Sequence, residues 1–203
     1  MADRVKTSDL KSKFLHLAQT SVFTVKLQPP SDVVSYLREK GFNYSQGGEG
    51  VELRCKNTML PGSKLETHDQ FNDYIGMTER MAYRRSFDTV QFDFYVDDRY
   101  DSIQMFEGWI EYISGQTTDD ESPYQGYRMN YPSSYKTNVF INKFEKGFGN
   151  DKSEDKGYEL QYTLVNAFPR STMPMTVDYG KSNILSYSVI MEFTKFIKKR
   201  VTL

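Results

Sequence analysis

The sequence predicts a mainly β protein, a sandwich or barrel with one helix packed against it. Several stretches alternate apolar and polar residues, which is the period of a strand with one buried face. A single stretch, at about residues 101–114, changes to the spacing of an amphipathic helix. A chain of 203 residues fits one domain, so we expect residues 1–203 to fold as a single unit.

The strands are predicted from alternation. It is clearest at residues 88–96, where Val90, Phe92 and Phe94 share one parity. Similar patterns predict further strands at residues 21–28, 51–56, 139–144, 158–164 and 184–197. The side chains expected in the core are Cys55, Phe92, Phe94, Phe106, Trp109, Val189 and Met191.

The helix is predicted from Ile103, Phe106 and Ile110, which recur at helical spacing. Asp101, with Gln104 three residues later, resembles a capping box, and Gly115 suits the C-cap. These signals predict a helix that begins near Asp101 and ends at Gly115.

The remaining segments are expected to be mostly irregular. Residues 1–20 are predicted to be an N-terminal arm with a short helix, and residues 29–50, 116–136 and 145–157 to be loop insertions. Residues 63–86 are expected to form a long extended loop, two arms around a turn near Gly76.

Composition excludes some classes of protein. There are 26 basic and 27 acidic residues, so the net charge of −1 argues against a protein built to grip nucleic acid, although a local basic patch remains open. One cysteine excludes an internal disulfide. The N-terminal residues lack the apolar region of a signal peptide, and no apolar run is long enough to span a membrane. The 15 tyrosines and 14 phenylalanines fit a protein contact surface and an aromatic β core equally well.

The letters Gly180-Lys181-Ser182 match the end of a phosphate-binding P-loop, but two requirements fail. The motif needs a glycine where Met175 stands, and it needs a helix after the lysine, whereas a strand pattern follows. We therefore interpret this segment as a turn entering the last strand.

No catalytic, cofactor or metal site is predicted. His16 and His68 have no metal-ligand partners at suitable spacing, and His68 beside Asp69 is better explained as a solvated pair. The carboxylates Asp93, Asp97 and Asp98 are expected on a polar strand face and before a helix.

Two further features have a structural and a minority functional interpretation. Residues 198–200, Lys-Lys-Arg, are expected to be a solvated tail rather than an anion contact. Trp109 could stack on a sugar or base, but on an apolar helix face it is more often part of the core.

Three ordered blocks resemble the tail tube proteins of contractile-tailed bacteriophages. The first, residues 52–66, carries the residues of a Cys-Lys-x-Thr-x-Leu-Pro pattern: Cys55, Lys56, Thr58, Leu60 and Pro61. The second, residues 84–115, has an arginine-rich turn, an alternating strand and then Phe106 and Trp109 in a helix. The third, residues 166–193, has Phe168-Pro169, then Ile184 and the final strand.

The resemblance implies a structural protein without enzymatic activity. Hexameric rings would stack helically into a tube inside the tail sheath, a fold shared with the tube of type VI secretion. The tube would guide tape-measure protein and DNA without binding DNA specifically, in a virion tail assembled in the host cytoplasm and with no membrane anchor. Residues 63–86 align with a loop that reaches the next ring, so we expect the stacking contact at Leu65, Phe71, Tyr74, Ile75 and Met77.

Alternatives remain open from sequence. The longer loops also fit a tube-initiator protein of the baseplate. If the chain is instead the tube subunit, such an initiator is expected to be one of its partners. A carbohydrate-binding β-sandwich would use the same tyrosines and Trp109. A hydrolase would need a nucleophile with a partner base, and we identify none.

Overall fold

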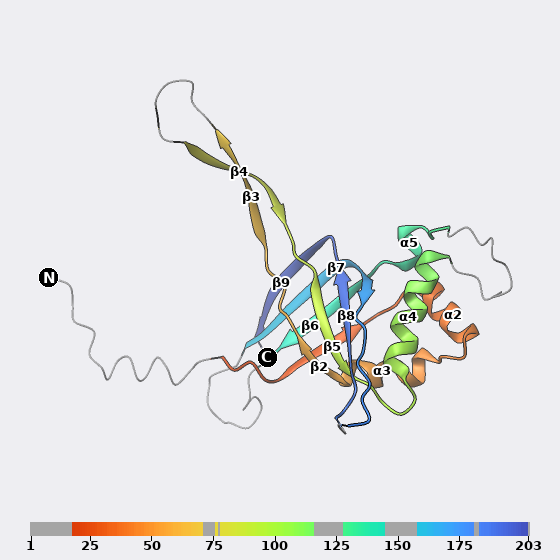
Figure 1. Cartoon of the computed structure of the whole chain (residues 1–203). Coiled ribbons are helices and arrows are strands. Elements are labelled where there is room, and N and C mark those ends of the chain that lie inside the picture. The colour runs from red at the N-terminus through yellow and green to blue at the C-terminus, as the bar shows by residue number, and fades with distance from the viewer. Residues whose placement is uncertain are drawn as a thin grey trace, which may run out of the picture.

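The computed structural model describes residues 18–70, 76, 78–115, 128–144, 158–180 and 183–202. The main body is a seven-stranded antiparallel sheet in the order β1-β6-β7-β8-β5-β2, with β9 pairing with β7 (Figure 1). The strands are β1 Phe23–Leu27, β2 Cys55–Thr58, β5 Val90–Tyr95, β6 Thr137–Lys143, β7 Tyr158–Thr172, β8 Ser186–Glu192 and β9 Lys195–Thr202. The predicted mainly β fold is confirmed.

Strand β7 links two halves of this sheet. Its first part pairs with β6 and β9, and its last part, from Phe168 to Thr172, pairs with β8. Between the two parts, Asn166 has a left-handed backbone with φ 56°, a conformation that asparagine tolerates better than most residues. Two groups of strands, β1-β6-β7-β9 and β7-β8-β5-β2, therefore share one continuous chain segment.

The predicted helix is α4, Asp101–Ser114, and it ends at Gly115 with φ 65°, as the C-cap glycine predicts. The predicted capping box is wrong. The N-cap residue is Tyr100, and the Oδ1 atom of Asp97 accepts a hydrogen bond of 3.0 Å from the backbone N–H of Asp101. Asp97 can do this because the chain turns at Tyr100, which has φ 59° and brings the preceding carboxylate back to the helix start.

The predicted loop at residues 29–50 is wrong, because this segment contains two helices. Helix α2, Ser31–Glu39, buries Val33 and Leu37, and helix α3 spans Tyr44–Leu53. The strand predicted at 51–56 is correspondingly shorter, since Val51 is buried within α3 and β2 begins only at Cys55. A short helix, α5, Pro132–Tyr135, lies beside α2 and α4 (Figure 1).

The core lies between the strands and the helix layer. Phe94 on β5 contacts Phe106 on α4 with ring centroids 5.1 Å apart, and Phe106 contacts Tyr187 on β8 at 6.4 Å. Tertiary contacts also hold α3, because the Tyr44 hydroxyl donates to the carbonyl of Leu27, and Glu52 accepts from the backbone N–H of Leu27 at 2.6 Å. The strands of the main sheet and the helices therefore pack around one hydrophobic core.

The last predicted strand is interrupted. The chain leaves β8 at Phe193, whose side chain is buried, and enters β9 after Thr194, whose N–H donates to the carbonyl of Val165 at 3.0 Å. Residues 198–200 are therefore part of a strand paired with β7, and the prediction of a tail there is wrong. The short helix predicted within residues 1–20 falls mostly outside the described residues, as do most of the insertions predicted at 116–136 and 145–157.

Candidate assembly surfaces

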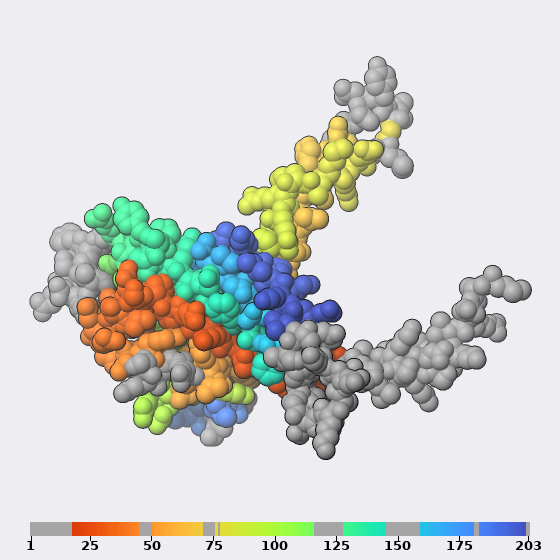
Figure 2. Space-filling model, turned by 180° about the vertical axis from the view of Figure 1, so that it is seen from behind, coloured from red at the N-terminus to blue at the C-terminus, as the bar shows by residue number. Residues whose placement is uncertain are grey.

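A long hairpin stands away from the body. Strands β3, Lys64–Gln70, and β4, Glu79–Ser86, form a separate two-stranded sheet that projects from one end of the molecule (Figures 1 and 2). Nearly all of its described side chains are exposed. An isolated two-stranded hairpin is marginally stable in water, so a hairpin of this length is typical of a segment that packs against a partner.

The hairpin carries both apolar and charged side chains. Leu65, Met81 and Tyr83 are exposed by 61%, 51% and 66%. Arg80 forms an ion pair of 3.1 Å with Asp69, a cross-strand contact that leaves His68 without the acid–base role considered from sequence. Four of the expected stacking residues, Phe71, Tyr74, Ile75 and Met77, lie outside the described residues, whereas Leu65 lies on β3.

Open strand edges form a second candidate surface. Among the described residues, β1 pairs only with β6, β2 only with β5, and β9 only with β7. Each of these strands has one edge that no described strand pairs with, although on β1 the N–H and C=O of Leu27 already bond to Glu52 and Tyr44. The backbone groups of such an edge can continue a sheet into another chain. Sequence alternation located the strands but carried no signal for their order in the sheet.

Six of the seven side chains expected in the core are buried, and the seventh is half-buried. Phe92 and Phe94 on β5, Val189 and Met191 on β8, and Phe106 and Trp109 on α4 are all buried. Cys55 is half-buried at the edge of this core, where burial raises the pKa of its thiol to about 12. Such a thiol is unsuited to nucleophilic catalysis, which requires the thiolate.

Trp109 is fully buried and its ring nitrogen Nε1 donates a hydrogen bond of 3.1 Å to the carbonyl of Tyr135. It therefore fixes α5 against α4. A buried indole cannot stack on a sugar or base at the surface, so the feature that suggested carbohydrate binding is used for packing.

The carboxylates singled out from the sequence do not form one site. Asp93 accepts hydrogen bonds from Gln91, Ser188 and Asn57, at 2.8, 2.6 and 3.1 Å, on the face of the sheet opposite Phe92 and Phe94. Burial raises the pKa of Asp93, but these hydrogen bonds outweigh burial and lower it on balance. The network ties β2, β5 and β8 together.

The second group of carboxylates also has a structural role. Asp97 pairs with Arg54 at 3.0 Å, and Asp101 lies 3.6 Å from the same guanidinium. These contacts link the end of α3 to the start of α4. Within the part of the chain that the structure describes, no cluster of metal-ligating side chains occurs.

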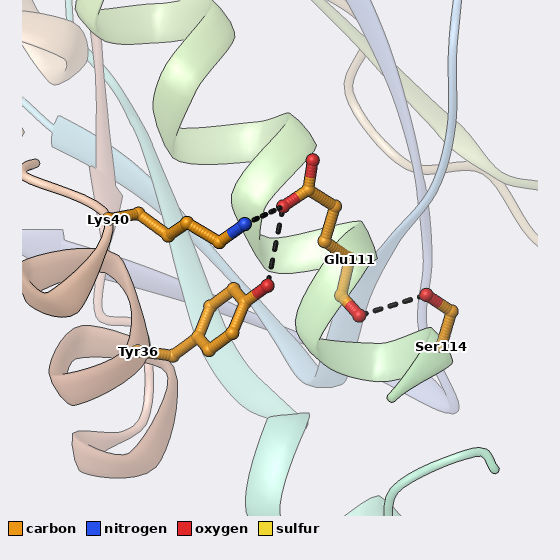
Figure 3. A network of polar contacts seen from close by, with 4 residues as sticks. All are labelled: Tyr36, Lys40, Glu111 and Ser114. Carbon is orange, nitrogen blue, oxygen red and sulfur yellow. Dashed lines mark hydrogen bonds and ion pairs between the residues drawn. The ribbon is translucent and has the colours of Figure 1, made fainter. Parts of the chain in front are cut away.

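A polar cluster on the helix layer joins α2 to α4 (Figure 3). The hydroxyl of Tyr36 donates to Glu111 Oε2 at 3.3 Å, and Lys40 Nζ lies 3.6 Å from the same atom. Burial raises the pKa of Tyr36, and the Glu111 carboxylate adds to this effect. Ser114 donates to the backbone carbonyl of Glu111. The cluster positions two helices and contains no nucleophile paired with a base.

One hollow in the described structure has a volume of about 630 Å³ and lies where β1, β6 and β7 meet the end of β2. Phe23, Leu60 and Leu160 line it together with Lys143. No carboxylate, histidine or cysteine belongs to its described lining. Separately, none of the described helices is long and apolar enough to cross a membrane.

Comparison with known proteins identifies the family. A family model described as "Phage tail tube protein" matches residues 18–199. No curated protein sequence matches significantly.

Solved structures share the fold. A chain of the sheath-tube complex of an extracellular contractile injection system, PVC, in the extended state superposes with a TM-score of 0.55 at 13% identity, over 98% of this chain and 100% of that one. A chain of the anti-feeding prophage cap, described as a tube terminating cap, superposes with a TM-score of 0.58 at 12% identity, over 92% and 93%. An Hcp protein superposes over 89% and 98% at 8% identity, with a TM-score of 0.42 that is too low to carry an argument.

The family match spans both groups of strands, the hairpin and the helix layer, and the superpositions show the same fold over nearly the whole chain. The function is therefore structural rather than enzymatic, as the sequence predicts. The chain belongs to the phage tail tube protein family.

Proposed function

We propose that this chain is the repeated subunit of an inner tail tube, in which hexameric rings stack to form the conduit for tape-measure protein and genomic DNA. The observation that carries the proposal is the β3–β4 hairpin, which projects beyond the body and contributes no strand to the main sheet. An isolated two-stranded hairpin is only marginally stable in water, so we expect this hairpin to gain stability when another subunit packs against it.

Within a ring, the open edges of β1, β2 and β9 supply the lateral contacts. A strand edge that pairs with the next subunit satisfies its backbone groups and removes an aggregation-prone edge at the same time. Because each ring repeats the same contact, a modest energy per subunit sums to a stable assembly. Between rings, the hairpin supplies the contact along the tube.

We extend the proposal to the partners of such a tube. The outside of the tube contacts a tail sheath protein, one end starts on baseplate tube-initiator proteins, and the particle is assembled in the host cytoplasm. A conduit must release what passes through it, and phosphate contacts would hold DNA strongly. The net charge of −1 supports a lumen that binds DNA weakly and without sequence preference.

The test replaces residues 68–80 with a short Gly-Ser linker. We expect this variant to keep the fold of its body, shown by a cooperative thermal unfolding transition close to that of the unmodified chain, but to stop at rings or monomers where the unmodified chain forms long tubes under the electron microscope. An exposed substitution away from the hairpin, Tyr131→Ser, is the matched control and is expected to form normal tubes. Normal tubes from the linker variant would contradict the proposal, and an unmodified chain that forms only single rings would favour a tube initiator.

A further inference from the structure

The end of the body opposite the hairpin carries a second concentration of exposed apolar side chains. The loops at residues 96–100, 173–180 and 183–185 lie at this end in both views (Figures 1 and 2). The exposed side chains there, which we call the loop-end patch, are Leu53, Tyr100, Val177, Tyr179 and Ile184. Leu53, Val177 and Ile184 are exposed by 84%, 83% and 72%, which is a high exposure for aliphatic side chains on one end of a body and marks a contact site.

Three of the segments that carry the patch, the β5–α4 loop, the entry of β8 and the end of α3, are fixed to one another. The backbone N–H of Val96 donates to the carbonyl of Leu185 at 3.0 Å, which joins the β5–α4 loop to the entry of β8. Arg54, next to Leu53, pairs with Asp97 at 3.0 Å and also accepts through its carbonyl from the N–H of Tyr95. The part of the patch formed by Leu53, Tyr100 and Ile184 is therefore carried by segments that are held to one another.

The patch contains a hollow of about 550 Å³. Val177, Ile184 and Leu185 form apolar parts of its wall, and Asp178 contributes a carboxylate. One oxygen of Asp178 accepts from the N–H of Gly180 at 2.8 Å, which orients the side chain. A space of this volume accommodates a few large side chains, and the adjoining loop adds a second exposed carboxylate, Asp98.

The hairpin has the complementary composition. It exposes Leu65, Met81 and Tyr83, and its exposed arginines include Arg84 and Arg85, whereas Arg80 is already paired with Asp69 in the hairpin itself. Apolar groups can enter an apolar hollow, and arginines can pair with carboxylates at its rim. The two surfaces also lie at opposite ends of the same chain, the arrangement required for a contact that repeats head to tail without closing on itself.

We propose that the loop-end patch receives the β3–β4 hairpin of a second copy of this chain. This rests on the proposed function, in which the hairpin connects successive rings, and it adds the surface on which the hairpin docks. The hollow between Val177 and Ile184 takes the apolar side chains of the hairpin, and Asp178 and Asp98 face its arginines.

The test uses two single-cysteine additions in separate batches of full-length protein. One batch carries Met81→Cys on the hairpin and the other carries Val177→Cys at the patch. Both positions are exposed, and the half-buried Cys55 reacts slowly. The batches are mixed under assembly conditions and treated with a short bismaleimide. The matched control pairs Met81→Cys with Tyr131→Cys, which is 77% exposed but lies beside α5.

Docking should raise the yield of the Met81–Val177 crosslinked dimer at least about tenfold over the control pair, because bound groups have a high effective concentration. A yield no higher than that of the control overturns the inference, whether or not particles form. The linker variant separates this result from the proposed function. If that variant fails to elongate but the crosslink is absent, only the docking surface is wrong, and if it elongates normally, hairpin stacking itself is wrong.

Discussion

A Cβ atom placed on Gly108 would lie 2.5 Å from Cδ2 of Leu37, so the missing side chain of Gly108 is what allows α4 and α2 to pack this closely. Glycine inside a helix costs about 1 kcal/mol relative to alanine, yet here it stands in the middle of α4. Leu37 is 1% exposed, so an added Cβ would force its Cδ2 to shift within the core, beside a hollow of about 290 Å³ that Leu37 and Gly108 both line.

We therefore predict that Gly108→Ala destabilises the subunit. Overpacking costs about 1–3 kcal/mol and exceeds the gain in helix propensity, so we expect a net loss of about 1 kcal/mol in the free energy of unfolding. Urea unfolding measures it. Gly50→Ala in α3 is the matched control, because its Cβ would meet only Arg54 at an ordinary 3.5 Å, and we expect it to be stabilising. Equal effects of the two changes would contradict the packing argument.

Trp109→Ala should destabilise the subunit by about 3–5 kcal/mol, as deletion of a large buried aromatic side chain does. The indole is fully buried, and the change would also leave the carbonyl of Tyr135 without its donor. Trp109→Phe keeps most of the ring volume and should lose less. Thermal unfolding followed by circular dichroism measures both. An unchanged melting temperature in Trp109→Ala would show that the indole is not part of the core.

Asp93→Asn should destabilise the fold at neutral pH and have little effect in acid. The pKa of Asp93 is lowered in the folded state, so its ionised form contributes stability above the ordinary carboxyl pKa, and this contribution is lost as the pH falls through the folded pKa. For a partly solvated network we expect a loss of about 1 kcal/mol at pH 7 that diminishes in acid as Asp93 becomes protonated in the folded state. Asp88→Asn, at an exposed position, is the control for removal of one carboxylate charge from the surface. A pH-independent difference for Asp93→Asn would rule out this account.

Cys55 should resist thiol reagents while the subunit is folded. Burial raises the pKa of its thiol to about 12, so very little thiolate exists at pH 8. We expect labelling by iodoacetamide to be at least about 100-fold slower than in guanidinium chloride, where the thiol recovers its ordinary reactivity. Equal rates in the two conditions would place Cys55 at the surface.

The elements predicted from local patterns agree with the structure where one face is buried. Val90, Phe92 and Phe94 alternate because β5 has one face on the core, and α4 has a regular apolar stripe for the same reason. Helix α3 could not be predicted in this way. Its sequence contains Gly47, Gly48 and Gly50, all poor helix formers, and the contacts of Tyr44 and Glu52 with β1 stabilise it instead.

The candidate surfaces could be predicted only in part. The hairpin was indicated by a long segment that keeps large apolar side chains, such as Leu65 and Tyr83. The loop-end patch depends on distant segments, Leu53, Tyr100 and Ile184, being brought to one end of the body. The sequence around each of these residues does not predict that they lie at the same end, because their proximity depends on the strand order β7-β8-β5-β2.

The shared strand β7 also bears on how the subunit withstands mechanical load. A pull applied to β9 or β6 reaches β8 through one continuous backbone, because all three pair with β7. Among the described strands, the two groups therefore cannot separate unless the pairing of β7 with one of them is broken. Under tension the subunit should yield as a whole rather than open in stages, a property suited to a rigid building block under sudden stress.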